Sequence, residues 1–305
     1  MCLLVRIFMK DFSKLAMHFN IKILFFLLYA SSLYNAAIFG FYQMHHLILS
    51  FLAKEDCDVV LPQDFYKIVH ILFAISIMFL NMSQFLMLIE RSIACYCYER
   101  YENSSHKLGY CLLAVAFIVP AILSVKTYYK DSFTFPMMSC LNTPKEVQSE
   151  IYFMLQLLIL LNIIALVVAF VLLYVNKKRQ DRNSPNVSTL STRYQASENA
   201  SSSGLLTVLC FIQLFIFLGY GSLVYYMKAN GDVLFGENNM GALYAAVEAS
   251  YLVYIYTLTL PLVTIYFIHF IIRKRQSSII SLVQIKATGE EGANNYADML
   301  AKQWA

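Results

Sequence analysis

The residues from Ile151 to Asn176 read IYFMLQLLILLNIIALVVAFVLLYVN, and this stretch contains no Asp, Glu, Lys or Arg. A helix of about 20 apolar residues is long enough to cross the hydrocarbon core of a bilayer. The basic residues Lys177, Lys178 and Arg179 follow directly, as is common where a membrane helix leaves the bilayer on the cytoplasmic side. The stretch therefore predicts a transmembrane helix that ends in a cluster of positive charge.

The whole chain has the composition of a membrane protein. Of its 305 residues, 59% are hydrophobic and 14% are charged, and the mean hydropathy is +0.58. Soluble domains carry about 25% charged residues, so a soluble globular protein is excluded. The chain also lacks the alternation of apolar and polar residues that a membrane β-barrel requires. We therefore expect an all-α, polytopic transmembrane helical bundle.

Six apolar stretches are long enough to span the bilayer, and they divide the chain into three parts. The first part, residues 1–19, is a cytoplasmic segment in which Arg6, Lys10 and Lys14 share one helical face, as in a basic amphipathic helix; a disordered lead-in and the stub of a lost first helix are the alternatives. The bundle follows over residues 20–275, and residues 276–305 form a cytoplasmic tail. The expected spans are about 20–48, 65–89, 107–129, 150–176, 200–227 and 241–272.

The distribution of basic residues predicts the orientation. Most of the 23 Lys and Arg residues lie at the two termini and in the second and fourth connections between spans. Because cytoplasmic segments retain the excess of basic residues, we expect a multi-pass protein of the cell membrane with both termini in the cytoplasm.

Two cysteines, Cys57 and Cys140, lie in the expected outer connections. Outer segments face an oxidising compartment, so the sequence predicts a disulfide between them. The alternative is two free thiols, because sequence does not show whether the two Cα atoms come close enough for a bridge.

Two cytoplasmic segments carry specific patterns. The second span ends in Glu90-Arg91, followed by Tyr101-Glu102. A charged pair at such a place can simply reach the membrane interface. The fourth connection runs into the fifth span with a second pattern, made up of Leu190, Ser191, Arg193, Tyr194, Gln195, Glu198 and Asn199.

Together the two patterns resemble those of the nematode serpentine chemoreceptors of the Sra superfamily. There the third transmembrane helix ends in E-R and Y-E, and L-S-x-R-Y-Q-x-x-E-N precedes the sixth. The tail residues Gly289, Gly292, Tyr296 and Trp304 look most like class alpha/beta of this superfamily, with class alpha next. The resemblance extends from about Phe19 to the C-terminus.

The resemblance implies a G-protein-coupled chemosensory receptor with a bundle of the rhodopsin-like type. It would bind a small molecule, signal through a heterotrimeric G protein and reside in the cilia of sensory neurons. The family has seven helices with an outer N-terminus, and by the resemblance the six spans correspond to helices two to seven, so that the first is missing. A truncated receptor paralogue that does not signal is therefore an alternative.

The resemblance also assigns a role to the basic residues on the inner side. Glu90 would neutralise Arg91 in the resting state. Release of Arg91 would let the inner end of this span engage the G protein beside Lys177, Lys178, Arg179 and Arg193.

Glu248 is the acid that lies within a span, where an ionisable group needs a partner or a water-filled cavity. His70 lies at a similar depth, and the resemblance implies that the two spans are neighbours, so we expect the two residues to pair in a ligand site with an aromatic wall of Tyr66, Tyr244 and Tyr251. The alternative is that Glu248 is bonded internally and His70 faces the lipid headgroups.

Two other classes of function fit the sequence less well. A six-span transporter or channel would carry several intramembrane charges along a path. A membrane enzyme would carry clustered His, Asp or Glu residues at catalytic spacing, and no such motif occurs. We therefore expect no enzyme activity, no metal or cofactor and no nucleic-acid partner; the lipid bilayer, a small ligand and a G protein are the expected partners.

Overall fold

The computed structural model describes residues 17–97, 101, 106–129, 133, 138–144, 146–182, 190–236 and 239–287, together with 289–290, 292–294 and 297 of the tail. The described part is helical and contains no strand. Its elements in chain order are α2 (Phe19–Leu52), η2 (Asp56–Val59), α3 (Gln63–Tyr96), α4 (Lys107–Tyr128), α5 (Gln148–Arg182), α6 (Leu190–Ala229), α7 (Gly231–Phe235), α8 (Met240–Ala249) and α9 (Val253–Ala287).

Six helical segments of the described chain are long and apolar enough to cross a membrane, in agreement with the six expected spans. The helices α2 and α3 have 34 residues each, and at 1.5 Å per residue this is a length of about 50 Å. The hydrocarbon core is about 30 Å thick, so the helices continue well beyond it.

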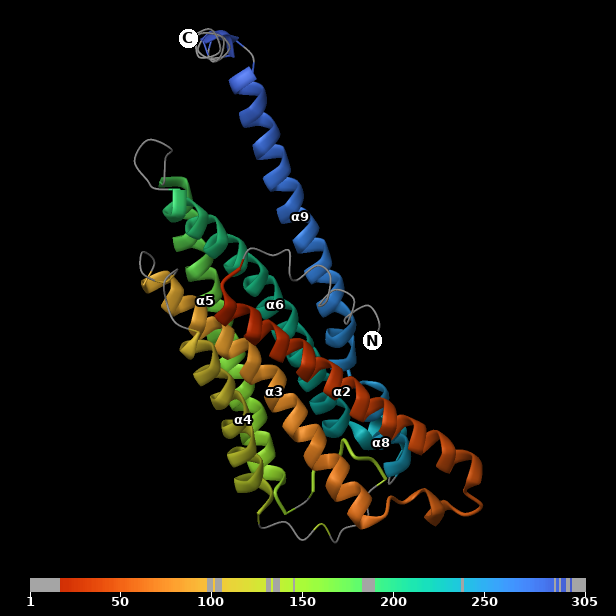
Figure 1. Cartoon of the computed structure of the whole chain (residues 1–305). Helices are drawn as coiled ribbons and strands as arrows, with labels where there is room; N and C mark the ends of the chain where they lie inside the picture. Colours follow the sequence, from red (N-terminus) through yellow and green to blue (C-terminus); the bar gives the residue numbers. More distant parts are fainter. Residues whose placement is uncertain are drawn as a thin grey trace.

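The helices run side by side in one bundle, and the first part of α9 packs on α6 and α2 before the helix continues beyond the others (Figure 1). The helix α3 lies in the middle, because α2, α4, α5 and α6 all pack against it. By contrast, α4 and α5 make little contact with each other. This arrangement leaves an opening between α4 and α5.

Chain direction alternates, which gives the bundle two distinct ends. One end holds the start of α2, the end of α3, the start of α4, the end of α5 and the start of α6. Both sequence patterns lie there, and we call it the motif end. The other end, here the opposite end, holds the connections after α2, α4 and α6.

Two helical boundaries differ from those expected. The helix α6 begins at Leu190, so the second pattern is part of the helix instead of preceding it. The expected span 241–272 consists of two helices, α8 and α9, separated by Ser250, Tyr251 and Leu252. The break places Tyr251 against α2, where Asn35 Nδ2 donates to the buried Tyr251 hydroxyl at 3.2 Å.

The side chains that face outward are apolar, as a lipid-exposed surface requires. Phe117, Ile118 and Ile122 on α4 and Phe153 and Leu160 on α5 are each more than half exposed. Inside the bundle, side-chain amides and hydroxyls bond to each other across helices. The burial pattern is thus that of a helical membrane bundle.

The motif end depends on close contact between α2 and α4 at Gly109. The backbone N–H of Gly109 donates to Asn20 Oδ1 at 3.2 Å. A Cβ atom at Gly109 would lie 2.8 Å from that oxygen and 3.1 Å from the Asn20 Cα. Only glycine permits this approach, because the backbone of Asn20 cannot move aside as a flexible side chain could.

We predict that Gly109→Ala lowers the stability of the protein by about 1–3 kcal/mol, the usual cost of overpacking. The matched control is Gly40→Ala on α2, where an added Cβ meets nothing within 4 Å. Thermal unfolding can be followed by the reaction of buried cysteines such as Cys210 with a thiol dye. Equal unfolding temperatures for the two variants would contradict the close contact.

Candidate functional site

A buried ion pair lies at the motif end of α3. Arg91 is 1% exposed and Glu90 is fully buried. Arg91 Nε donates to Glu90 Oε2 at 2.5 Å, and Nη2 donates to Oε1 at 2.6 Å. The guanidinium and the carboxylate therefore form a two-pronged pair, the geometry in which Arg binds carboxylates most strongly.

The second sequence pattern supplies the remaining partners of Arg91 from α6. Arg91 Nη1 donates to Asn199 Oδ1 at 3.2 Å and to Ser202 Oγ at 2.9 Å. Glu198 Oε1 lies 4.0 Å from the same nitrogen. Residues more than 100 positions apart in sequence thus meet at one guanidinium, which joins α3 to α6.

Tyr101 and Asn20 extend the cluster to α2 and α4. The Tyr101 hydroxyl donates to Glu90, and Asn20 Nδ2 donates to the Tyr101 hydroxyl at 3.3 Å. Burial and, to a lesser extent, the neighbouring Glu90 raise the pKa of Tyr101, so its phenol stays protonated and remains a donor. The backbone N–H of His18 donates to Glu198 Oε1 at 2.6 Å, which closes the cluster from the α2 side.

We call these residues the motif cluster: His18, Asn20, Glu90, Arg91, Tyr101, Glu198, Asn199 and Ser202. The sequence patterns identified Glu90, Arg91, Tyr101, Glu198 and Asn199, and the structure brings all five together. The patterns missed His18, Asn20 and Ser202. A polar residue at the start of an apolar stretch was the signal for Asn20, and Ser202 lies one helical turn from Glu198.

The other predicted residues of the motif end do not belong to the motif cluster. Some of them lie outside the residues that the structure describes. Lys177 and Lys178 are exposed on α5, and Arg179 donates to the backbone oxygen of Cys95 on α3. Gln195 is buried on α6. Arg91 turns inward to α6 and does not join the exposed lysines. Glu102 and the side chains of Leu190, Ser191, Arg193 and Tyr194 lie outside the described residues.

At the opposite end, the structure gives His70 and Glu248 separate partners in place of the expected pair. His70 Nδ1 lies 2.8 Å from the backbone oxygen of Cys140, and Nε2 lies 3.0 Å from the Tyr128 hydroxyl. Tyr42 OH donates to Glu248 Oε2 at 2.9 Å, and Gln43 Nε2 donates to Oε1 at 2.8 Å. Cys140 thus occupies His70, whereas Tyr42 and Gln43 of α2 occupy Glu248.

These contacts hold the segment 139–142 down on the bundle. The Cys140 N–H donates to Tyr42 OH at 3.1 Å, and Tyr66 OH donates to the backbone oxygen of Asn142 at 2.8 Å. The predicted ligand residues Tyr66, His70 and Tyr251 are thus engaged internally, whereas Tyr244 is half-buried on α8. Tyr42 and Gln43 were missed, because neither belongs to a sequence pattern.

The structure does not contain the predicted disulfide. Cys140 is a free, fully buried thiol, and the side chain of Cys57 lies outside the described residues. Burial first, and Glu248 second, raise the pKa of the Cys140 thiol, so it stays protonated and unreactive. Among the described residues, no three His, Cys, Asp or Glu side chains are grouped so that they could hold a metal ion.

The six long apolar helices in the described part of the chain define a multi-pass helical membrane protein. Comparison with known sequences gives a narrower assignment. The model of the family described as "Serpentine type 7TM GPCR receptor class ab chemoreceptor" matches residues 1–305. The chain therefore belongs to this family of GPCR-like chemosensory receptors, as the two sequence patterns predicted, and the match includes the first 18 residues that the resemblance had left out.

Similar proteins from Caenorhabditis elegans bear related names. Serpentine receptor class beta-17 is 33% identical over 303 residues, which cover 99% of this chain and 82% of that protein. Serpentine receptor class beta-13 is 27% identical over 307 residues, which cover 99% of this chain and 87% of that protein. Serpentine receptor class beta-1 is 25% identical over 296 residues, which cover 97% of this chain and 86% of that protein. No solved structure matches the chain.

The motif cluster contains a histidine, His18, whose pKa differs between the folded and the unfolded chain. His18 Nδ1 accepts from the backbone N–H of Asn20 at 3.3 Å and so caps α2. Burial lowers the pKa of His18; Glu90 raises it by less, and Arg91 and His106 lower it further. The unfolded chain, with a histidine pKa of about 6.5, therefore binds this proton more readily than the folded chain.

We predict that the stabilisation from neutral His18 is complete above about pH 6.5 and is lost as the pH falls below that value. His18→Asn keeps a capping acceptor but cannot titrate in this range. Unfolding temperatures at pH 7.5 and pH 5.5 should therefore differ less in His18→Asn than in the wild type. An unchanged difference would show that His18 does not contribute to the pH dependence.

Proposed function

We propose that the protein is a small-molecule receptor that signals through a heterotrimeric G protein, with the motif end facing the cytoplasm. The observation that carries this proposal is the motif cluster. Four residues of two separate family patterns surround the buried guanidinium of Arg91, and they join the helices α3 and α6. Such a joint, placed at one end of a bundle, can hold that end closed.

The burial of Arg91 makes this joint suitable as a switch. Removing an isolated ion from water costs several kcal/mol, and the pair with Glu90 and the bonds to α6 offset that cost. A second arrangement, in which Arg91 leaves α6 and meets water or a partner, also satisfies the charge. Two states of similar free energy are what a signalling equilibrium requires.

The proposed active state exposes positive charge at the motif end. In the described structure Lys177 and Lys178 are already exposed on α5, next to the end of α3 that Arg179 contacts. Release of Arg91 would add a further cation beside them, and Arg193 belongs to the same region of the sequence. This surface would suit the acidic groups of a G protein.

The orientation and the cellular location belong to the same proposal. The excess of Lys and Arg at the motif end supports a cytoplasmic placement of this end and of both termini. Family membership supports placement in the cilia of sensory neurons.

Truncation of Arg91 alone would be a poor test. It would leave the Glu90 carboxylate buried without its counter-charge, at a cost of about 3–5 kcal/mol. Removing the negative partner is more informative, because Arg91 can then leave the cluster.

We predict that Glu90→Gln raises the ligand-independent rate of nucleotide exchange on a purified heterotrimeric G protein. The expected increase is about fivefold or more, because fivefold corresponds to the lower end of typical coupling energies between two sites. The receptor should be reconstituted in lipid vesicles. The double variant Glu90→Gln, Arg91→Gln removes both charges and should return exchange to the background rate. Ser92→Ala, which removes only a bond to the Leu88 backbone, is the matched control.

Surface density must be equal in all variants, because exchange is compared per receptor. Wild-type exchange in both Glu90→Gln and the double variant would assign Arg91 a purely structural role and would overturn the proposal.

A further inference from the structure

A small cavity lies inside the bundle between α3, α4 and α5. Its volume is about 110 Å³. Three side-chain amides, Asn81, Gln84 and Asn162, line it, and the rest of the wall is apolar, including Met82, Phe85, Pro120 and Leu158. No charged residue lines this cavity. It is therefore suited to an uncharged group that can form hydrogen bonds.

Two of the three amides are satisfied within the protein. Asn162 Nδ2 donates to Asn81 Oδ1 at 2.6 Å, and Gln213 Nε2 donates to Asn81 Oδ1 and to Asn162 Oδ1 at 3.0 Å each. These bonds fix the positions of both asparagines. Asn81 and Asn162 thus form a rigid polar wall.

Gln84 differs from these two amides. It is 2% exposed, and neither its Nε2 nor its Oε1 has a hydrogen-bond partner in the described part of the chain. The Cys210 thiol lies near it, but a thiol is only a weak donor and acceptor. A buried amide without partners costs free energy, so a ligand that satisfies it gains binding energy at this place.

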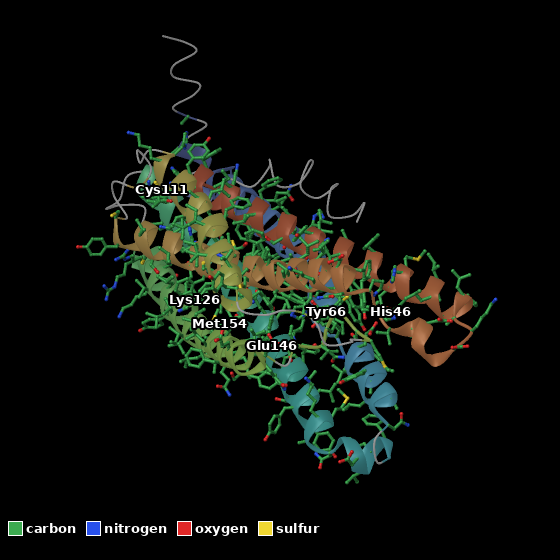
Figure 2. All side chains as sticks on the ribbon, turned by 90° about the horizontal axis from the view of Figure 1, so that it is seen from below. His46, Tyr66, Cys111, Lys126, Glu146 and Met154 are labelled. Carbon is green, nitrogen blue, oxygen red and sulfur yellow. The ribbon has the colours of Figure 1, made fainter. Side chains whose placement is uncertain are left out.

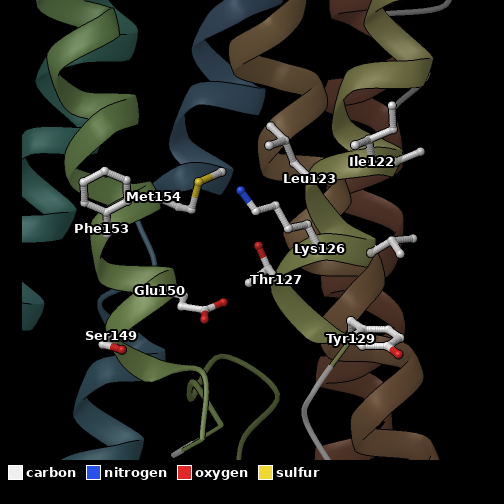
Figure 3. A pocket seen from close by; sticks show the side chains of 11 residues that line it. Ile122, Leu123, Lys126, Thr127, Tyr129, Ser149, Glu150, Phe153 and Met154 are labelled. Atoms are coloured by element: carbon white, nitrogen blue, oxygen red, sulfur yellow. The ribbon is translucent and has the colours of Figure 1, made fainter.

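A larger groove lies beside this cavity. The groove has a volume of about 930 Å³ and lies between α4 and α5, where the two helices make little contact. Leu123 and Met154 line both spaces and form the partition between them. Figure 3 shows Lys126 from α4 and Glu150 from α5 extending into the groove near its mouth.

Residues 139–142, in the connection between α4 and α5, are bonded to Tyr42, Tyr66 and His70 at the opposite end of the bundle. Seen from below, Lys126 and Met154 lie together, away from Tyr66 and His46 (Figure 2). The groove is lined by exposed apolar side chains such as Ile122 and Phe153, as a surface that faces lipid requires.

We propose that this cavity binds the hydroxyl end of an uncharged aliphatic alcohol, which enters from the bilayer between α4 and α5. A hydroxyl donates and accepts, so one group can satisfy both Oε1 and Nε2 of Gln84, whereas a ketone can only accept. A carboxylate would be buried without a counter-charge. An engineered cavity of about 150 Å³ in another protein holds one benzene molecule. The present cavity is smaller, so it has room for the hydroxyl and the first few carbon atoms of the alcohol, and the rest of the aliphatic chain would lie in the groove.

The inference rests on the proposed receptor function, whose ligand class it names. It is tested by occupancy of the cavity, which does not depend on G-protein activation, so the two proposals can fail separately. The probe is a diazirine-bearing analogue of 1-octanol, photolysed on the full chain in lipid nanodiscs. Mass spectrometry then locates the label.

We expect labelling of residues that line the cavity, such as Met82 and Leu123, and suppression of this labelling by excess 1-octanol. Suppression should be weaker with 2-octanone and weakest with octanoate. Gln84→Leu should weaken the competition by 1-octanol about three- to tenfold, the effect of one or two lost hydrogen bonds. Leu123→Phe should reduce labelling by filling the partition, whereas Val167→Leu, on the lipid-facing side of α5, should not.

Gln84→Leu should also unfold at a higher temperature than the wild type, because it removes an unpartnered buried amide. A lower unfolding temperature would show that Gln84 has an internal role and would overturn the inference. So would label that is spread over the lipid-facing helices without competition by 1-octanol, which is the result expected if lipid chains alone fill the groove. Competition by octanoate equal to that by 1-octanol would overturn the ligand class.

Discussion

The need to pair one buried guanidinium governs the motif end of this bundle. Arg91 is enclosed by protein, and every neighbour that the two sequence patterns provide offers it an acceptor or a negative charge. Glu90 supplies the counter-charge from the same helix, and α6 supplies the oxygens of Asn199 and Ser202. Tyr101 and Asn20 extend the bonds to α2 and α4. The positions of four helices thus depend on one cation, because removing any partner would leave a buried charge incompletely satisfied.

Three groups of polar side chains lie along the bundle, and they differ in how many of their hydrogen-bonding atoms have a partner. The motif cluster and the bonds that hold residues 139–142 close the two ends. Between them lies the amide layer of Asn81, Asn162 and Gln213, in which Gln84 alone among the cavity-lining amides lacks a partner. An amide without a hydrogen-bond partner is costly in a membrane interior, since no bulk water reaches it. Gln84 is therefore a place inside the bundle where a ligand can add binding energy.

Much of the fold followed from the sequence, because hydropathy depends on local composition alone. The number of apolar spans and the family were predicted, and the family patterns led to Glu90, Arg91, Tyr101, Glu198 and Asn199. The contacts could not be predicted in the same way: Arg91 and Asn199 are 108 positions apart, and their contact depends on how α3 packs on α6. The pairing of His70 with Glu248 was expected from depth in the membrane. Depth in the membrane does not predict which side chains and loop residues pack beside each group. The separate partners of His70 and Glu248 therefore became visible only in the structure. Gln84 carried no signal at all, since an amide in an apolar stretch looks the same whether it is bonded or unbonded.

The central claim is that the motif cluster holds α3 against α6 until a G protein binds. The most direct test is the distance between spin labels at Cys97, exposed at the end of α3, and at Ser197→Cys on α6, with the exposed Cys111 replaced by serine. The distance should be short and narrowly distributed in the receptor alone. It should lengthen when nucleotide-free heterotrimeric G protein is added to the reconstituted receptor. A distribution that stays the same with and without bound G protein would contradict the account.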